Sequence, residues 1–367
     1  MLKEKQILVY EEETTPKQKN RWQKIGGIAL KVGAFVGTFI LAIAITLAVV
    51  LGSICSDAYP SAQQMFVSTV LETGQLKFLA SMFVSEDKIN EIVNSNSMET
   101  FSDEVDAGLI EIGGEQQNEQ QKDIEVLEVS RSTFSGTMMI VKDPARVSLA
   151  TIYPWRAEGV TLDELVKQSG AVGGINGGLY DSYNNSGGKP YGVVVSNGEI
   201  QRNLPQEYKG LVLVGFTNKH ILQIMDVSAM TPADVERLVK EKGIRDAVTF
   251  QEEASKDNNH FVQLIINGSV REISGMGSGL NPRTAIGQRA DGTVLLFVTD
   301  GRGKAGHLGA SAGDLISVMQ EFGAVNAANL DGGSSSCMFY EGKYLKSSVT
   351  FYYENSSWKL PAGFVVK

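Results

Sequence analysis

The sequence predicts an α+β fold: one transmembrane helix and a helical stalk, followed by a mostly β-sheet domain with packed helices. Three observations support this prediction. An uncharged segment near the N-terminus is long enough to cross a membrane. From residue 124 onward, short β-rich segments alternate with Gly, Asn and Asp turns, and three amphipathic helices with N-cap signals interrupt them.

The membrane prediction rests on residues 32–55, which carry no charged side chain. At about 1.5 Å per residue, a helix of this length crosses a hydrocarbon core of roughly 30 Å. Seven Lys or Arg residues precede it within residues 1–31, so the positive-inside rule puts the N-terminus in the cytoplasm. We therefore expect a single-pass cell-membrane protein whose main domain is extracellular. A cleaved signal peptide and a lipoprotein attached at Cys55 are the alternatives.

The segment between the membrane and the main domain is expected to have two parts. Residues 56–95 have apolar side chains at helical spacing and predict a juxtamembrane helical stalk. Residues 96–123 are acidic and poor in large apolar groups, which is typical of a solvated linker. On this interpretation a protein that starts near Ile124 folds alone.

Residues 124–367 are expected to form the main domain. Several β-rich segments are joined by Asn-Gly or similar turns, which favour hairpins. Helix N-caps are expected at Thr161 with Glu164, at Thr231 with Pro232, and at Ser311 with Asp314.

Composition excludes some classes of protein. The 367-residue chain is 43% hydrophobic, which allows a sizeable core, and its net charge of -9 argues against nucleic acid as a partner. The two cysteines, Cys55 and Cys337, exclude a disulfide framework and a CxxC metal site, and Cys337 is expected in the core.

Polar, Gly-rich motifs follow apolar segments at four places in the main domain, and each carries one candidate site residue. The motifs are GGINGGLYD (173–181) with Asn176, NPRTAIG (281–287) with Arg283, TDGR (299–302) with Asp300 and nearby His307, and NLDGGSSS (329–336) with Asp331. One such motif can be a simple turn, but four in one domain predict a pocket.

The side chains in these motifs suggest anion binding. Consecutive glycines at Gly332 and Gly333 can expose successive N–H groups to an anion, and Ser334 can add a hydroxyl. The guanidinium of Arg283 can grip a phosphate through two hydrogen bonds. These groups are compatible with an anionic ligand, and a structural ion pair is the alternative role for Arg283.

In order and spacing, the four motifs, together with YGVVVSNGEI, resemble the phosphodiester glycosidase family over residues 125–367. The resemblance implies a hydrolase that cleaves sugar-1-phosphodiester linkages at the anomeric carbon, here in cell-surface or extracellular glycans, with phosphate as the leaving group. It implies catalytic roles for Asp331, Asp300 and Arg283. The substrate-binding residues that we expect are Asn176, Gly177, Thr284, His307, Gly332, Gly333 and Ser334.

Two other functions are compatible with the same residues. Carboxylate, amide and imidazole groups are also metal ligands, so a metal-dependent phosphodiesterase is one alternative. A non-catalytic glycan-binding domain is the other, although only Trp155 and Trp358 follow the membrane segment. We expect no cofactor, with a divalent metal left open.

Overall fold

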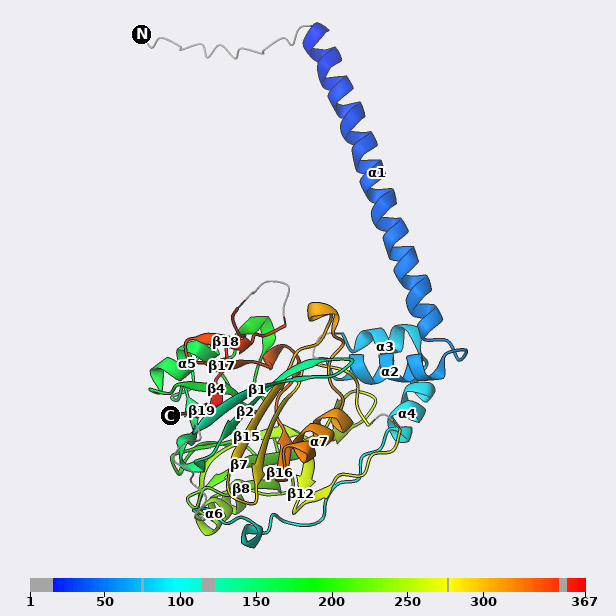
Figure 1. Cartoon of the computed structure of the whole chain (residues 1–367). Helices are drawn as coiled ribbons and strands as arrows, with labels where there is room; N and C mark the ends of the chain where they lie inside the picture. Colours follow the sequence, from blue (N-terminus) through cyan, green and yellow to red (C-terminus); the bar gives the residue numbers. More distant parts are fainter. Residues whose placement is uncertain (1–15, 74–75, 114–122, 276, 350–354) are drawn as a thin grey trace, which may run out of the picture. The chain divides into compact units, whose positions relative to one another are not determined.

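The computed structural model describes residues 16–73, 76–113, 123–275, 277–349 and 355–367 (Figure 1). The chain divides between Tyr59 and Pro60 into two compact units. Four predicted segments lie partly outside the described residues: the N-terminal segment at positions 1–15, the stalk at 74–75, the acidic linker at 114–122, and the main domain at 276 and 350–354.

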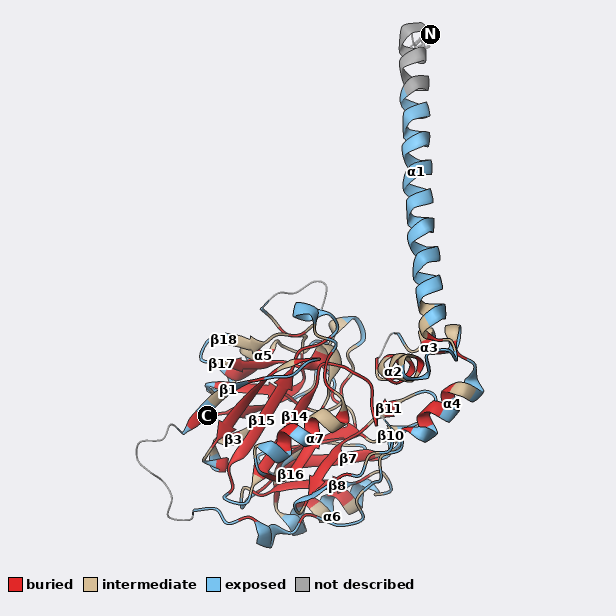
Figure 2. Cartoon of the chain, turned by 45° about the vertical axis from the view of Figure 1, so that its right-hand side comes forward, coloured by how far each residue is buried: buried red, intermediate tan, exposed pale blue. Residues whose placement is uncertain are grey.

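The first unit contains one long helix, α1 (Pro16–Ile54). Its part from Ile25 to Ile54 has a mean hydropathy of 2.7 and is long and apolar enough to cross a membrane. Figure 2 shows its surface as exposed along most of this length. The predicted span at 32–55 falls within this helix except for its last residue, and a signal sequence near the N-terminus can also be long and apolar enough to meet this criterion.

The second unit consists mainly of antiparallel sheets. The large sheet has the order β1-β2-β15-β14-β16-β12-β13. A second sheet, named the α5 sheet after the helix that packs on it (α5, Leu162–Gln168), has the order β18-β17-β4-β19-β3. A third, named the α6 sheet after helix α6 (Pro232–Lys242), has the order β6-β5-β9-β7-β8. A further pair is β10-β11. The strand bounds are β1 Ile124–Ser130, β2 Ser135–Val141, β3 Val147–Thr151, β4 Gly173–Asn176, β5 Val193–Ser196, β6 Glu199–Asn203, β7 Leu211–Thr217, β8 Leu222–Asp226, β9 Ile244–Gln251, β10 Glu253–Ala254, β11 Asn259–His260, β12 Gln263–Ile266, β13 Ser269–Val270, β14 Thr284–Arg289, β15 Val294–Thr299, β16 Ala324–Asn329, β17 Met338–Tyr340, β18 Lys343–Lys346 and β19 Ala362–Val366.

Each of the three main sheets turns one face toward a common apolar core. Residues in this core include Met139, Ile286 and Leu296 of the large sheet, Leu149, Ile175 and Phe364 of the α5 sheet, and Val194, Val214 and Val248 of the α6 sheet. The opposite face of each sheet packs against one helix: α7 (Ala312–Glu321), α5 (Leu162–Gln168) and α6 (Pro232–Lys242), respectively. This confirms the predicted α+β class, mostly sheet with packed helices.

The expected local signals form as predicted. All three helices begin with a capping box, at Thr161, Thr231 and Ser311, in which side chains satisfy N–H groups that the first turn leaves free. The Asn-Gly pairs that join β5 to β6 and β12 to β13 have positive φ at both residues, as the tightest hairpin turns require.

The segment before β1 differs from the predicted stalk and linker. Helices α2 (Pro60–Leu71), α3 (Phe78–Phe83) and α4 (Glu86–Ser95) belong to the same compact unit as the sheets. Within the supposed linker, Val105 and Ile110 are buried in the common core, and the Phe101 N–H donates to Gln263. A few apolar side chains, spaced along an acidic segment, thus dock it against the domain although its overall composition predicts solvation.

Candidate active site

The four Gly-rich motifs meet at one end of the large sheet. Strand β14 lies between β15 and β16 and is antiparallel to both, so the ends of those strands flank its beginning. The Thr299 N–H donates to the Arg283 carbonyl at 2.9 Å, and the Leu330 N–H donates to the Thr284 carbonyl at 2.8 Å. Asn176, the last residue of β4, reaches the same place from the α5 sheet.

Asn176 and its neighbours hold the backbone of Asp331. The buried Asn176 amide donates to the Asp331 carbonyl at 2.7 Å and accepts from the Thr284 hydroxyl at 2.7 Å. The Asp331 N–H donates to the Gly177 carbonyl at 3.3 Å. The structure therefore places Asn176, Gly177 and Thr284 beside Asp331, where their observed contacts fix the loop that carries the carboxylate.

Asp331 is a partly buried carboxylate with an unusual protonation range. Burial raises its pKa to about 7, while hydrogen bonds from the Ser335 hydroxyl and the Gly332 N–H and the positive charge of Arg302 act in the opposite direction. The Tyr180 hydroxyl lies 2.9 Å from the Ser335 hydroxyl, and burial together with the Asp331 charge keeps the pKa of Tyr180 well above its usual value. Asp331 can therefore exchange a proton near neutral pH.

The glycine loop after Asp331 is arranged differently from the predicted anion nest. The Gly333 N–H donates to the Pro282 carbonyl at 2.8 Å, and the Gly332 N–H bonds to the Asp331 carboxylate. Gly333 has φ +62°, and a Cβ at this position would lie 2.7 Å from the Arg302 guanidinium. Glycine is thus required because the backbone is left-handed and an arginine lies over it.

Arg283 does not face open space in this structure, and it forms a structural ion pair, which was the alternative to a phosphate clamp at this residue. The side chain is 5% exposed, and its Nε donates to the Ala310 carbonyl at 3.0 Å. One terminal nitrogen donates to the Gly279 carbonyl and forms an ion pair with Glu72, and the guanidinium stacks 4.8 Å from the Phe261 ring centre. These contacts make Arg283 a buried structural group.

Arg302 is the cation that lies at the glycine loop. It is exposed, its Nη1 donates to the Ser334 hydroxyl at 3.0 Å, and its charge acts on Asp331. Its Nε donates to the Asn281 side-chain oxygen at 3.2 Å. An exposed guanidinium beside a carboxyl group with a raised pKa, such as Asp331, can bind a phosphate.

Asp300 and His307, both predicted site residues, form a pair. One Asp300 oxygen accepts from the Ser135 N–H at 2.8 Å, and the other lies 2.8 Å from His307 Nδ1. Asp300 is buried, whereas the His307 side chain is 27% exposed. A carboxylate at Nδ1 orients the imidazole, and this arrangement can leave Nε2 for proton transfer.

Metal ligands do not cluster in the part of the chain that the structure describes. No group of three or more His, Cys, Asp or Glu side chains there is placed to hold a metal ion.

Sequence reasoning did not single out Arg302, Tyr180, Ser335 or Glu72. Three of them lie inside the quoted motifs, so the motifs marked the correct loops but not every side chain in them. Glu72 has no motif around it, and only the folded structure shows its contact with Arg283.

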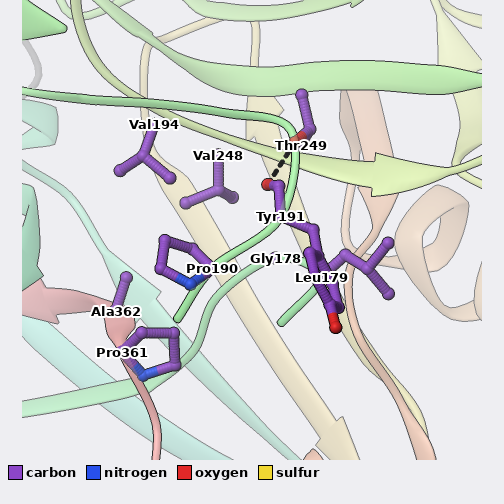
Figure 3. A pocket seen from close by; sticks show the side chains of 9 residues that line it. All are labelled: Gly178, Leu179, Pro190, Tyr191, Val194, Val248, Thr249, Pro361 and Ala362. Atoms are coloured by element: carbon purple, nitrogen blue, oxygen red, sulfur yellow. Dashed lines mark hydrogen bonds between the residues drawn. The ribbon is translucent and has the colours of Figure 1, made fainter. Parts of the chain in front are cut away.

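A small, mostly apolar pocket lies next to this loop cluster along the chain (Figure 3). Its lining residues are Gly178, Leu179, Pro190, Tyr191, Val194, Val248, Thr249, Pro361 and Ala362. The Thr249 hydroxyl donates to the Tyr191 carbonyl at 3.0 Å, shown as a dashed line. Gly178 directly follows Gly177, so the pocket begins one residue beyond the contact to Asp331. Asp331, Asp300 and Arg302 are not among the residues that line this pocket.

A family model described as phosphodiester glycosidase matches residues 169–367, which is more than half of the chain. The chain belongs to the phosphodiester glycosidase family. All four motifs lie inside the matched region, whereas Glu72 and α2 to α4 precede it. Family membership supports a glycosidase-type function for this phosphodiester glycosidase domain.

Individual relatives are distant. An uncharacterized protein YomE, derived from the SPbeta prophage of Bacillus subtilis (strain 168), is 29% identical over 167 residues, which cover 44% of this chain and 24% of that protein. The chain thus spans about a quarter of that relative's length. The zebrafish N-acetylglucosamine-1-phosphodiester alpha-N-acetylglucosaminidase catalytic domain, auto-inhibited by its pro-peptide, has a TM-score of 0.51 and 17% identity, covering 67% of this chain and 84% of that chain. A hypothetical protein from Synechocystis has a TM-score of 0.43 and 17% identity, covering 66% of this chain and 62% of that chain.

Proposed function

We propose that the protein is a membrane-anchored hydrolase that cleaves sugar-1-phosphodiester linkages in cell-surface or extracellular glycans. The observation that carries this proposal is the pairing of Asp331, whose pKa of about 7 suits acid-base chemistry, with the exposed cation Arg302 at the same loop. Family membership supports the same reaction class.

In the proposed reaction, water adds to the anomeric carbon and the bond from that carbon to the phosphate oxygen breaks. The products are a free sugar and a phosphate monoester, and the transition state has oxocarbenium character. Arg302 binds the phosphate and offsets the charge that develops on it as it leaves. The ionised Asp331 accepts a proton from the attacking water, and the His307–Asp300 pair is the second candidate for proton transfer.

The direct test uses the purified full chain and a panel of sugar-1-phosphodiesters that differ in the sugar. Release of free sugar from at least one member, unchanged by a chelator, is the expected result because the proposed chemistry uses only protein groups. Loss of activity with chelator would favour the metal-dependent phosphodiesterase. Tight binding of a panel member without turnover would favour a glycan-binding domain.

We also propose that the domain after α1 lies outside the cell. The basic residues before the apolar stretch support this orientation. Protease added to intact cells is expected to digest the domain after Tyr59 and to leave an epitope at the N-terminus protected. Digestion of the N-terminal epitope with a protected domain would contradict the proposed orientation.

A further inference from the structure

Glu72 is a buried carboxylate at the end of α2, far from the family region in sequence. Its side chain is 1% exposed. One oxygen accepts from the Gly279 N–H at 2.7 Å and the Asn259 amide at 3.0 Å, and the other pairs with Arg283 and accepts from the Asn281 amide at 3.0 Å. Burial raises the pKa of Glu72, and the charge of Arg283 opposes this shift. All four donors lie after residue 124, in the part of the second unit that contains the sheets.

One of these contacts continues to the candidate active site. The Asn281 side chain donates through Nδ2 to Glu72 and accepts through Oδ1 from Arg302 Nε at 3.2 Å. Arg302 then donates through Nη1 to the Ser334 hydroxyl at 3.0 Å. A continuous hydrogen-bonded chain thus links Glu72 to the loop that carries Asp331.

The donors and acceptors in this hydrogen-bonded series explain why a carboxylate is needed at position 72. An ionised carboxylate only accepts hydrogen bonds, so it selects the Asn281 orientation in which the amide nitrogen faces Glu72. The amide oxygen must then face Arg302, which only donates. The Asn281 amide nitrogen also donates to the Thr69 carbonyl, but at the longer distance of 3.4 Å. With an amide at position 72, only this longer contact would select the Asn281 orientation, and the acceptor of Arg302 would be held less firmly.

We propose that Glu72 is a positioning residue for the active site: through Asn281 it holds the Arg302 guanidinium at Ser334 and Asp331. This inference rests on the proposed function, in which Arg302 binds the substrate phosphate. The membrane-proximal segment, which is separated from the end of α1 by five residues, is then an integral part of the site.

Binding of inorganic phosphate to the full-length protein in detergent, measured by calorimetry, tests this inference without relying on turnover. Wild type is expected to bind phosphate. Glu72→Gln should weaken binding by about 10- to 100-fold, the effect of losing a hydrogen bond to a charged group. Glu72→Gln also leaves Arg283 without its counter-charge, so Asn281→Ala is the second variant. It keeps the Glu72–Arg283 pair but removes the hydrogen-bonded link between Glu72 and Arg302, and it should weaken phosphate binding similarly.

Glu86→Gln is the matched control. Glu86 lies in α4 of the same segment and pairs with Lys256, but both side chains are exposed. We expect unchanged phosphate affinity in this variant. A residue that only stabilises the fold would lower the melting temperature without changing the affinity of the folded protein.

The possible results separate the inference from the function on which it rests. Wild-type affinity in folded Asn281→Ala and Glu72→Gln would overturn the positioning role and leave the proposed function standing. Tighter binding in Glu72→Gln would also overturn it, because Glu72 would then compete with the anion. A wild-type protein that binds no phosphate would overturn the Arg302 anion site and the inference together.

Discussion

Asp331→Asn is expected to reduce sugar release by about 10²- to 10⁴-fold, the usual contribution of a general acid or base, while the protein remains folded. Asn has the shape of Asp and keeps one acceptor oxygen for the hydrogen bonds that Asp331 receives from Ser335 and the Gly332 N–H, so the loop should largely keep its geometry. It cannot exchange a proton near neutral pH or carry the negative charge. Sugar release at pH 7 and the melting temperature are the two measurements.

Asp331→Asn should also differ from wild type in how its free energy of unfolding depends on pH. Burial raises the Asp331 pKa from 3.8 to about 7, so folding favours the protonated form. Its contribution to stability is fully present below about pH 4 and is lost as the pH rises through 7. Asp331→Asn should therefore gain stability relative to wild type between pH 4 and pH 8. For this partly exposed side chain we expect a gain of about 1 to 3 kcal/mol.

Asp226→Asn is a suitable control for both measurements. Asp226 ends β8, is exposed, and accepts a hydrogen bond from the Ser228 N–H. We expect full activity in this variant and no comparable gain in stability with pH. A fully active Asp331→Asn protein would show instead that Asp331 is only a turn residue.

The parts of the fold that could be predicted depend on interactions that are local in sequence. Ser311 bonds to the N–H of Asp314 three residues later, and the Asn197-Gly198 turn joins strands that are adjacent in sequence. Such contacts need no knowledge of the rest of the chain. The position of Asp331 after a buried strand was predictable in the same way, because the apolar residues up to Leu330 precede it directly.

The parts that could not be predicted depend on pairing between distant segments. Glu72 and Arg283 are 211 positions apart, and the helix before Glu72 has no motif that marks a site residue. Arg283 has the right chemistry for a phosphate clamp, and only its burial against Phe261 and Glu72 shows that its donors serve the fold. Arg302 lies in a turn that many sequences contain. Its place in the candidate site depends on the contact between Arg302 and the Ser334 hydroxyl, which only the tertiary structure creates.

Removal of the segment before β1 is expected to destabilise the protein strongly, contrary to the sequence-based expectation that a chain starting near Ile124 folds alone. A protein that starts at Ile124 lacks Glu72, so the buried guanidinium of Arg283 keeps its charge without its partner. Breaking a buried ion pair in this way costs about 3 to 5 kcal/mol. The truncation also removes Val105 and Ile110 from the common core, and each buried aliphatic side chain is worth about 1.5 to 3 kcal/mol.

The comparison that isolates this effect is between proteins that start at Pro60 and at Ile124, since neither contains α1. The Pro60 protein should be soluble with a cooperative melting transition, because it contains the whole second compact unit. The Ile124 protein should aggregate or melt at least roughly 10 °C lower. Arg283→Met in the Ile124 protein should recover part of the loss, because an apolar side chain carries no charge to leave unpaired. Equal melting temperatures for the two truncations would mean that Glu72 and the segment around it contribute little to the fold, and the buried ion pair would then be an accessory contact.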